Sequence, residues 1–126
     1  MTSQTPPRSD NMRRLEAVCA ALPETRRVDV EGWGGEPTFR VRGKVFVFTS
    51  PEAAGVTVKL PHIEAEALVA SDAAVTPTGY GLGRHGWVSA DLGENLSEEC
   101  WQEVEEWVRT SYTLVAPKKL AKLVEA

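Results

Sequence analysis

The sequence has few of the features that mark membrane or secreted proteins. No apolar run approaches the roughly 20 residues that a helix needs to cross a bilayer, and the start, MTSQTPPRSD, lacks the apolar stretch of a secretory signal. The two cysteines, Cys19 and Cys100, form neither a Cys-x-x-Cys pair nor a disulfide framework. We therefore expect a cytoplasmic protein with reduced thiols and no membrane contact.

Arrangements of residues that carry catalysis are also missing from the sequence. There is no Gly-x-Ser-x-Gly elbow, and Glu64 and Glu66 lie two apart in a predicted helix, where they point to different sides. Neither His62 nor His85 has a second histidine or cysteine at ligand spacing. We expect no enzyme, no catalytic residue, no metal and no cofactor. A small-molecule enzyme would need an acid or thiol with a strongly perturbed pKa inside a cleft.

Two patterns resemble functional motifs, but a purely structural role explains each of them better. Residues 81–86, GLGRHG, match Gly-x-Gly-x-x-Gly but lead into a predicted strand, whereas a phosphate-binding loop opens a helix. A flexible loop is the better interpretation. Cys100 lies in the first turn of a predicted helix, where a thiolate could be stabilised, but it shares a face with Trp101, Val104 and Trp107. We expect Cys100 to be a buried, inert thiol.

The length and charge of the chain limit its organisation and its partners. The 126 residues, 42% of them hydrophobic, fit one compact domain, which we place at 9–126 after a disordered tail at 1–8. The net charge is −4 and the pI is about 5.2. Residues 1–60 hold nine Lys/Arg against seven Asp/Glu, and residues 61–126 hold five against eleven. This acid excess counts against strong DNA binding unless the acidic side chains face away.

Periodicity and turn residues predict a mixed fold of helices and strands. One helix starts with Ser9 or Asp10 as its cap and ends at Pro23, another begins at Pro61, a third follows the cap Ser97, and a short one begins at Pro117. Strands are expected within 25–33 and at 37–41, 44–49, 55–60 and 87–92.

The stretch PTFRVRGKVFVFTS, residues 37–50, predicts a hairpin around the dipeptide Arg42-Gly43. A two-residue loop would place Arg42 and Lys44 at the tip, and a change of one residue in loop length would exchange the faces. The expected facing pairs are Val41 with Lys44, Arg40 with Val45, and Phe39 with Phe46.

Basic residues from separate segments are candidate contacts to a phosphate backbone. Arg40, Arg42 and Lys44 lie on the first hairpin, Lys59 ends the next strand, and Arg84 precedes the strand at 87. Cations on two projecting loops suit a protein that straddles nucleic acid. Exposed strands also carry Lys and Arg for solubility and to discourage edge pairing, which explains any one of these residues about as well.

Several segments in the same order resemble the MmcQ/YjbR family of small bacterial proteins. They are GKVF at 43–46, VTVKL at 56–60, Pro77 with a loop into RHGWVSADL, and SYTLV at 111–115 before a lysine-rich ending. The resemblance spans about residues 10–124. It implies an α+β fold, a two-layer α/β sandwich with an antiparallel sheet and helices on one face. It also implies DNA binding through a double-wing arrangement of the sheet and its loops, with Lys44, Lys59 and Arg84 at matching positions and Trp87 and Tyr112 in structural roles.

Two functions therefore remain open. The first is a non-enzymatic DNA-binding protein that contacts double-stranded DNA through Arg40, Arg42, Lys44, Lys59 and Arg84. The alternative is a protein- or ligand-binding adaptor whose open sheet face presents aromatic anchors. The candidate anchors are Trp33, Phe48, Tyr80 and Trp87.

Overall fold

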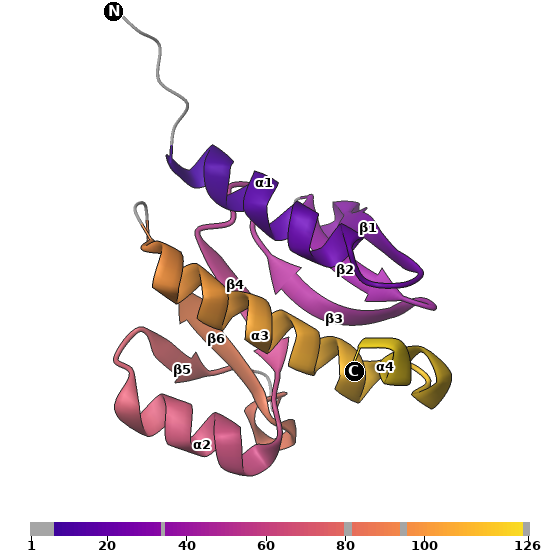
Figure 1. The fold of residues 1–126 in the computed structure, drawn as a ribbon. Helices are drawn as coiled ribbons and strands as arrows, with labels where there is room; N and C mark the ends of the chain where they lie inside the picture. The colour runs from indigo at the N-terminus through magenta and orange to yellow at the C-terminus, as the bar shows by residue number, and fades with distance from the viewer. Residues whose placement is uncertain (1–6, 34, 80–81, 94–95, 125–126) are drawn as a thin grey trace, which may run out of the picture.

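The computed structural model describes residues 7–33, 35–79, 82–93 and 96–124, which form an antiparallel sheet and a layer of helices (Figure 1). This is the α+β sandwich that the sequence predicts. The elements, in chain order, are α1 (Pro7–Ala20), β1 (Thr25–Val30), the 3-10 turn η1 (Glu31–Trp33), β2 (Glu36–Val41), β3 (Lys44–Thr49), β4 (Gly55–Lys59), α2 (His62–Ser71), β5 (Val75–Pro77), the 3-10 turn η2 (Leu82–His85), β6 (Trp87–Asp91), α3 (Glu98–Val115) and α4 (Lys118–Val124).

The six strands are ordered β1-β2-β3-β4-β6-β5, and every neighbouring pair is antiparallel. The chain leaves the sheet after β4 through α2 and returns at the edge as β5, so that β6 fits between β4 and β5. In Figure 1, α3 crosses in front of the sheet with α1 beside it, and α2 lies near the β5–β6 edge.

The core lies between the sheet and the helices because alternate strand residues face the helical layer. Val56 and Val58 of β4 are buried, while Thr57 and Lys59 between and after them are only half-buried. From the helical side, Leu15 of α1 and the Trp101, Val104, Val108 and Tyr112 stripe of α3 are buried against these residues. The Tyr112 ring meets Phe46 of β3 edge-on, with 5.4 Å between centroids.

The first hairpin has the predicted turn but not the whole predicted register. Arg42 and Gly43 have φ values of 52° and 84°, and Val41 faces Lys44 while Arg40 faces Val45, as expected. The expected pair Phe39–Phe46 is wrong, because a bulge follows and Phe39 faces Val47. The extra residue allows both Phe46 and Val47 to be buried, which strict alternation would not permit.

The ends of two elements differ from the sequence predictions. Helix α1 begins at Pro7, inside the predicted tail, because proline fits the first turn of a helix, where no backbone N–H bond is needed. Residues 1–6 of that tail lie outside the described residues. Strand β5 was not predicted. It has three residues, of which only Val75 is buried, and so it carries no alternating pattern.

The expectation that Cys100 is buried is wrong. Cys100 is exposed and Cys19 of α1 is the buried thiol. The buried stripe of α3 starts at Trp101, and the preceding residue is rotated about 100° away from it, so Cys100 faces solvent at the start of the helix. Desolvation raises the pKa of the Cys19 thiol, which keeps it in the neutral form. No helix in the described ranges is long and apolar enough to cross a membrane.

Candidate nucleic-acid interface

The antiparallel connections bring basic residues from many segments to one end of the sheet. By the directions of the strands, the β2–β3 turn, the β4–α2 junction and the η2 loop before β6 lie at the same end of the sheet. In Figure 1, α1 and α3 run toward the side of the β2–β3 turn, and the β4–α2 junction lies at the lower edge. Hydrogen bonds join these segments. For example, Leu60 N–H donates to the Gly86 carbonyl at 2.9 Å, and the Tyr112 hydroxyl donates to the Pro23 carbonyl at 2.7 Å. We call this the basic end, with cations Arg26, Arg40, Arg42, Lys44, Lys59, Arg84, Lys118, Lys119 and Lys122.

The opposite end of the strands is acidic. Among the residues there whose side chains the structure describes, Arg13 and Arg14 are cationic, and Arg27 pairs with Asp29. The basic end holds nine cations and three glutamates, Glu24, Glu64 and Glu66, so charge is separated along the strands rather than between the two faces of the sheet. The acidic end, as we use the term, consists of Asp10, Asp29, Glu31, Glu36, Glu52, Asp72, Asp91, Glu98, Glu99 and Glu103.

Helix α3 accounts for part of this separation. Ser97 caps the helix by accepting a hydrogen bond from the Cys100 N–H at 3.1 Å. Glu98 and Glu99 occupy the first turn, where the positive end of the helix dipole stabilises anions. The glutamates that gave the second half of the sequence its acid excess therefore begin at the end of α3 that is remote from the basic end.

Arg42, at the tip of the first hairpin, is paired with an acidic residue. Its Nε lies 2.7 Å from Glu24 Oε1, and its Nη2 donates to Glu24 Oε2 at 3.2 Å. The hydrogen bond from Arg42 lowers the pKa of Glu24, so this carboxylate stays charged at neutral pH. Both side chains are about half exposed, and a polyanion would have to compete with Glu24 for Arg42.

The other four predicted residues have no carboxylate partner within the described ranges. Arg40 is half-buried on β2, where its Nε donates to Thr38 Oγ1 at 3.0 Å, so it stands apart from the tip. Lys44 and Arg84 are exposed, and Lys59 is half-buried opposite Trp87 of β6. Strands β3 and β6 both neighbour β4, but the β3–β4 ladder ends at Val47 and Val58, so the first hairpin extends beyond the part of the sheet that pairs with β4.

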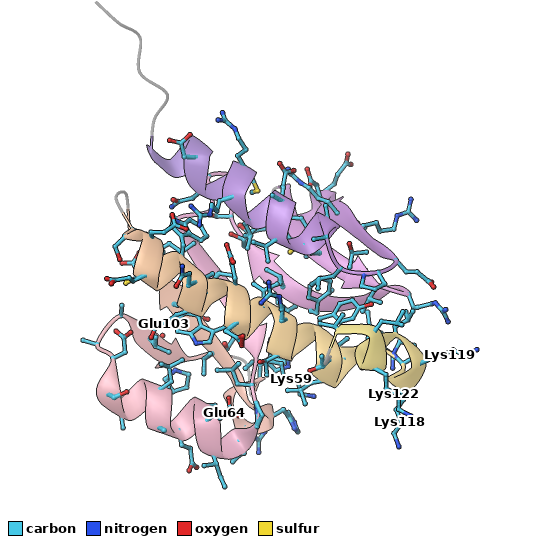
Figure 2. The ribbon with its side chains drawn as sticks, in the orientation of Figure 1. Lys59, Glu64, Glu103, Lys118, Lys119 and Lys122 are labelled. Atoms are coloured by element: carbon cyan, nitrogen blue, oxygen red, sulfur yellow. The ribbon has the colours of Figure 1, made fainter. Side chains whose placement is uncertain are left out.

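Sequence reasoning missed the lysines of α4. Lys118, Lys119 and Lys122 are exposed, and Figure 2 shows them projecting from α4 at the same end of the molecule as the first hairpin. The lysine-rich ending was visible in the sequence, but nothing in its pattern indicated which loops it would meet. The position follows only from the direction in which α3 crosses the sheet.

The sheet face away from the helices holds two of the four predicted aromatic anchors. The rings of Phe48 and Trp87 are half-buried and meet edge-on, with 5.4 Å between centroids. A shallow cavity of about 210 Å³ lies beside Phe48 and includes Thr57 and Ser89, whose hydroxyl oxygens are 2.9 Å apart. Tyr80 and the side chain of Trp33 lie outside the described residues. Within the described ranges, no three His, Cys, Asp or Glu side chains are arranged to hold a metal ion.

Comparisons with known proteins support this architecture. The family model described as YjbR matches residues 20–114. The crystal structure of DR2400, a Deinococcus radiodurans protein with a DUF419 domain, is similar with a TM-score of 0.68 and 23% sequence identity, covering 98% of this chain and 92% of that one. At this identity the likeness concerns the fold alone. A comparison with curated proteins found no match.

Proposed function

Because this chain belongs to the YjbR family and gathers nine cations at one end of its fold, we propose that it is a non-enzymatic protein that binds double-stranded DNA through its basic end. The separation of charge along the strands is the observation that carries the proposal. It supplies an electrostatic footprint that the net charge of −4 conceals.

The distance between the two ends decides whether the acid excess opposes binding. A strand of six residues, such as β2 or β3, is about 20 Å long at roughly 3.3 Å per residue. The Debye length at physiological ionic strength is about 8 Å, so carboxylates at the acidic end are more than two screening lengths from a phosphate held at the basic end. Their repulsion is therefore weak compared with the attraction of the nearby cations.

The cations available for phosphate contacts come from three sites. Lys44 at the first hairpin, Lys59 with Arg84 at the second loop, and the lysines of α4 are free of ion pairs to any described residue. Lysine and arginine contacts to phosphate fix the position of a duplex without reading its sequence. We therefore propose binding with little base preference, in which Arg42 contributes only when it leaves Glu24.

Fluorescence anisotropy with a labelled duplex of about 25 base pairs tests the proposal. We expect binding at low salt that weakens steeply as salt rises, because each phosphate contact contributes about −0.9 to the slope of log K against log salt. The double variant Lys44→Ala, Arg84→Ala should bind more weakly, with a slope smaller in magnitude by about two.

A matched control removes one cation from the acidic end. Arg13→Ala deletes an exposed arginine whose acidic neighbour is Asp10, at 3.6 Å. It should leave the salt slope unchanged, because this side chain lies far from the basic end. If the parent protein does not bind at low salt, or if the double variant binds like the parent, the basic end is not a DNA-binding surface.

A further inference from the structure

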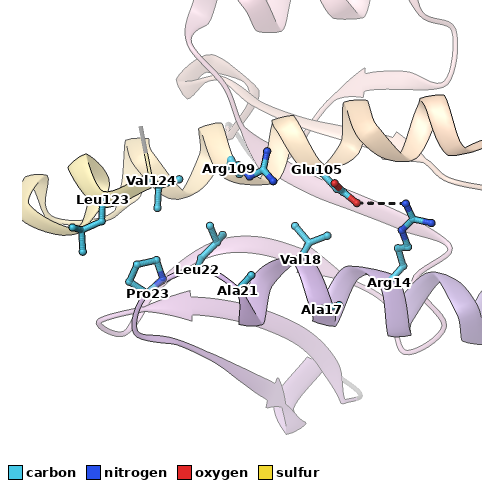
Figure 3. A pocket seen from close by; sticks show the side chains of 10 residues that line it. All are labelled: Arg14, Ala17, Val18, Ala21, Leu22, Pro23, Glu105, Arg109, Leu123 and Val124. Atoms are coloured by element: carbon cyan, nitrogen blue, oxygen red, sulfur yellow. Dashed lines mark ion pairs between the residues drawn. The ribbon is translucent and has the colours of Figure 1, made fainter. Parts of the chain in front are cut away.

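A groove on the helical layer has no role in the proposed DNA contact. It lies between α1 and the pair α3–α4, and its volume is about 470 Å³, within the range of small-molecule sites (Figure 3). Val18 and Leu22 point from α1 toward α3, and Val124 points from α4 toward α1 (Figure 3). Leu123 borders the groove with 66% of its surface exposed, an unusual position for a large apolar side chain.

The groove is open on the side of α1 because two of the α1 side chains that line it are small. Ala17 and Ala21 stand four residues apart, are both exposed, and line the groove. Residues at this spacing lie on the same side of a helix, so together they leave an open apolar channel beside Val18. A hydrocarbon chain laid in this channel would remove apolar surface from water on both sides.

Two arginines border the groove, and they differ in how far acidic neighbours neutralise them. Arg14, at one end, forms ion pairs with Glu98 and with Glu105, the latter at 3.5 Å. Arg109 extends from α3 beside Leu22 and Val124 (Figure 3). Within the described ranges its acidic contact is Glu106, on the same helix, at 3.9 Å and mostly exposed. Arg109 is therefore the cation that remains available to a ligand.

We propose that this groove binds an aliphatic carboxylate, whose hydrocarbon chain lies along the apolar walls while its carboxylate pairs with Arg109. A guanidinium presents a planar fork of N–H donors that matches a carboxylate, and such charge-assisted hydrogen bonds are the strong ones. The ligand chain would cover Leu123. The groove reaches α4, whose lysines belong to the basic end, but none of the nine cations lines it, so its test does not depend on DNA binding.

Isothermal titration calorimetry with hexanoate, octanoate and decanoate, each below its micelle concentration, tests the apolar part of the proposal. Affinity should rise about fourfold for each added methylene, since one buried methylene is worth about 0.8 kcal/mol. Decyltrimethylammonium carries the same hydrocarbon chain with the opposite charge, and we expect it to bind at least tenfold more weakly than decanoate. Equal binding of the two would overturn the proposal.

Two variants test the place of binding. Arg109→Gln retains a polar side chain but loses the charge, and it should weaken decanoate binding about tenfold, while Arg13→Gln at the acidic end should not. Ala21→Trp fills the groove from an exposed position and should abolish binding with an unchanged melting temperature. If Arg109→Gln binds like the parent, or if amide shifts in NMR titrations fall outside α1, α3 and α4, the site is elsewhere and the proposal is wrong.

Discussion

At the scale of single residues, Ser111 joins α3 to the sheet at the point where the β3–β4 ladder stops. The last paired residues toward the basic end are Val47 and Val58. Beyond them, the fully buried Ser111 hydroxyl accepts a hydrogen bond from Lys59 N–H at 2.9 Å and donates one to the Phe46 carbonyl at 2.6 Å. One hydroxyl thus satisfies both the carbonyl of the bulged residue Phe46 and the backbone N–H of Lys59. The side chain of Lys59 belongs to the basic end.

We expect Ser111→Ala to lower the free energy of unfolding by about 2–3 kcal/mol, because it leaves a buried donor and a buried acceptor without their partner. Thr113→Ala is the matched control. Among the described residues, its hydroxyl donates only to the Thr110 carbonyl, three residues earlier in the same helix, and its loss should cost less than about 1 kcal/mol. Urea unfolding measures both. Similar losses for the two variants would show that the Ser111 bridge adds no stability.

The two cysteines and the Glu24–Arg42 ion pair show which properties of single residues can be predicted from the sequence. The face of α3 containing Trp101, Val104 and Val108 was readable from helical spacing, but the edge of that face was not, which is why Cys100 was wrongly expected to be buried. The partner of Arg42 lies 18 residues earlier in the chain. No local pattern indicates such a contact, because it depends on how β1 follows α1 into the sheet.

At the scale of elements, two glycines hold the loops of the basic end in different ways. Gly43 has φ +84°, and a Cβ placed there would meet nothing within 4 Å. Gly86 has φ +90°, and a Cβ there would lie 2.2 Å from the Leu60 carbonyl oxygen. The second glycine therefore provides both a left-handed conformation and the close approach that lets Leu60 N–H bond to the Gly86 carbonyl.

Gly43→Ala should cost about 1–2 kcal/mol of stability, the usual penalty of a left-handed conformation for an L-residue. Gly86→Ala should cost more than about 3 kcal/mol, because backbone at Leu60 must also move. Thermal or urea unfolding of the two variants compares them directly, and equal costs would contradict the close contact at Gly86. Amide shifts at Lys59 should change in Gly86→Ala and stay constant in Gly43→Ala.

Most elements could be predicted because each carries its own local signal. The Arg42-Gly43 turn, the alternating β4 and the Ser97 cap were all readable from a few residues. The bulge after Phe39 was not, since it reflects the burial of Phe46 under Tyr112, a residue far along the chain. Strand β5 is too short for a period and ends in Pro77, so its pairing with β6 depends on tertiary structure.

At the scale of the whole molecule, the sign of the charge depends on position along the strands. The charge counts for the two halves of the sequence predicted this arrangement only in part. The five predicted cations all lie toward one end, but the sequence could not indicate that the α4 lysines join them or that Glu64 and Glu66 lie there too. Composition reports a sum of charges, whereas the field at a surface depends on where each charge is placed.

Glu24→Gln tests this charge arrangement. The substitution removes the carboxylate that holds Arg42, so both the local charge and the number of available cations increase. We expect tighter duplex binding and a salt slope larger in magnitude by about one. Glu31→Gln makes the same change at the acidic end and should have a much smaller effect. Equal gains for the two variants in anisotropy titrations would mean that only net charge matters.

The separation of acidic and basic side chains gives the protein a permanent electric moment along the strands. The dipoles of α1 and α3, whose positive ends lie at the acidic end, reduce this moment in part. In the field of a polyanion, such a molecule experiences a torque and rotates its cationic loops inward while it is still diffusing. A larger share of collisions then begins in a productive orientation. We expect added salt to slow association much more than it speeds dissociation.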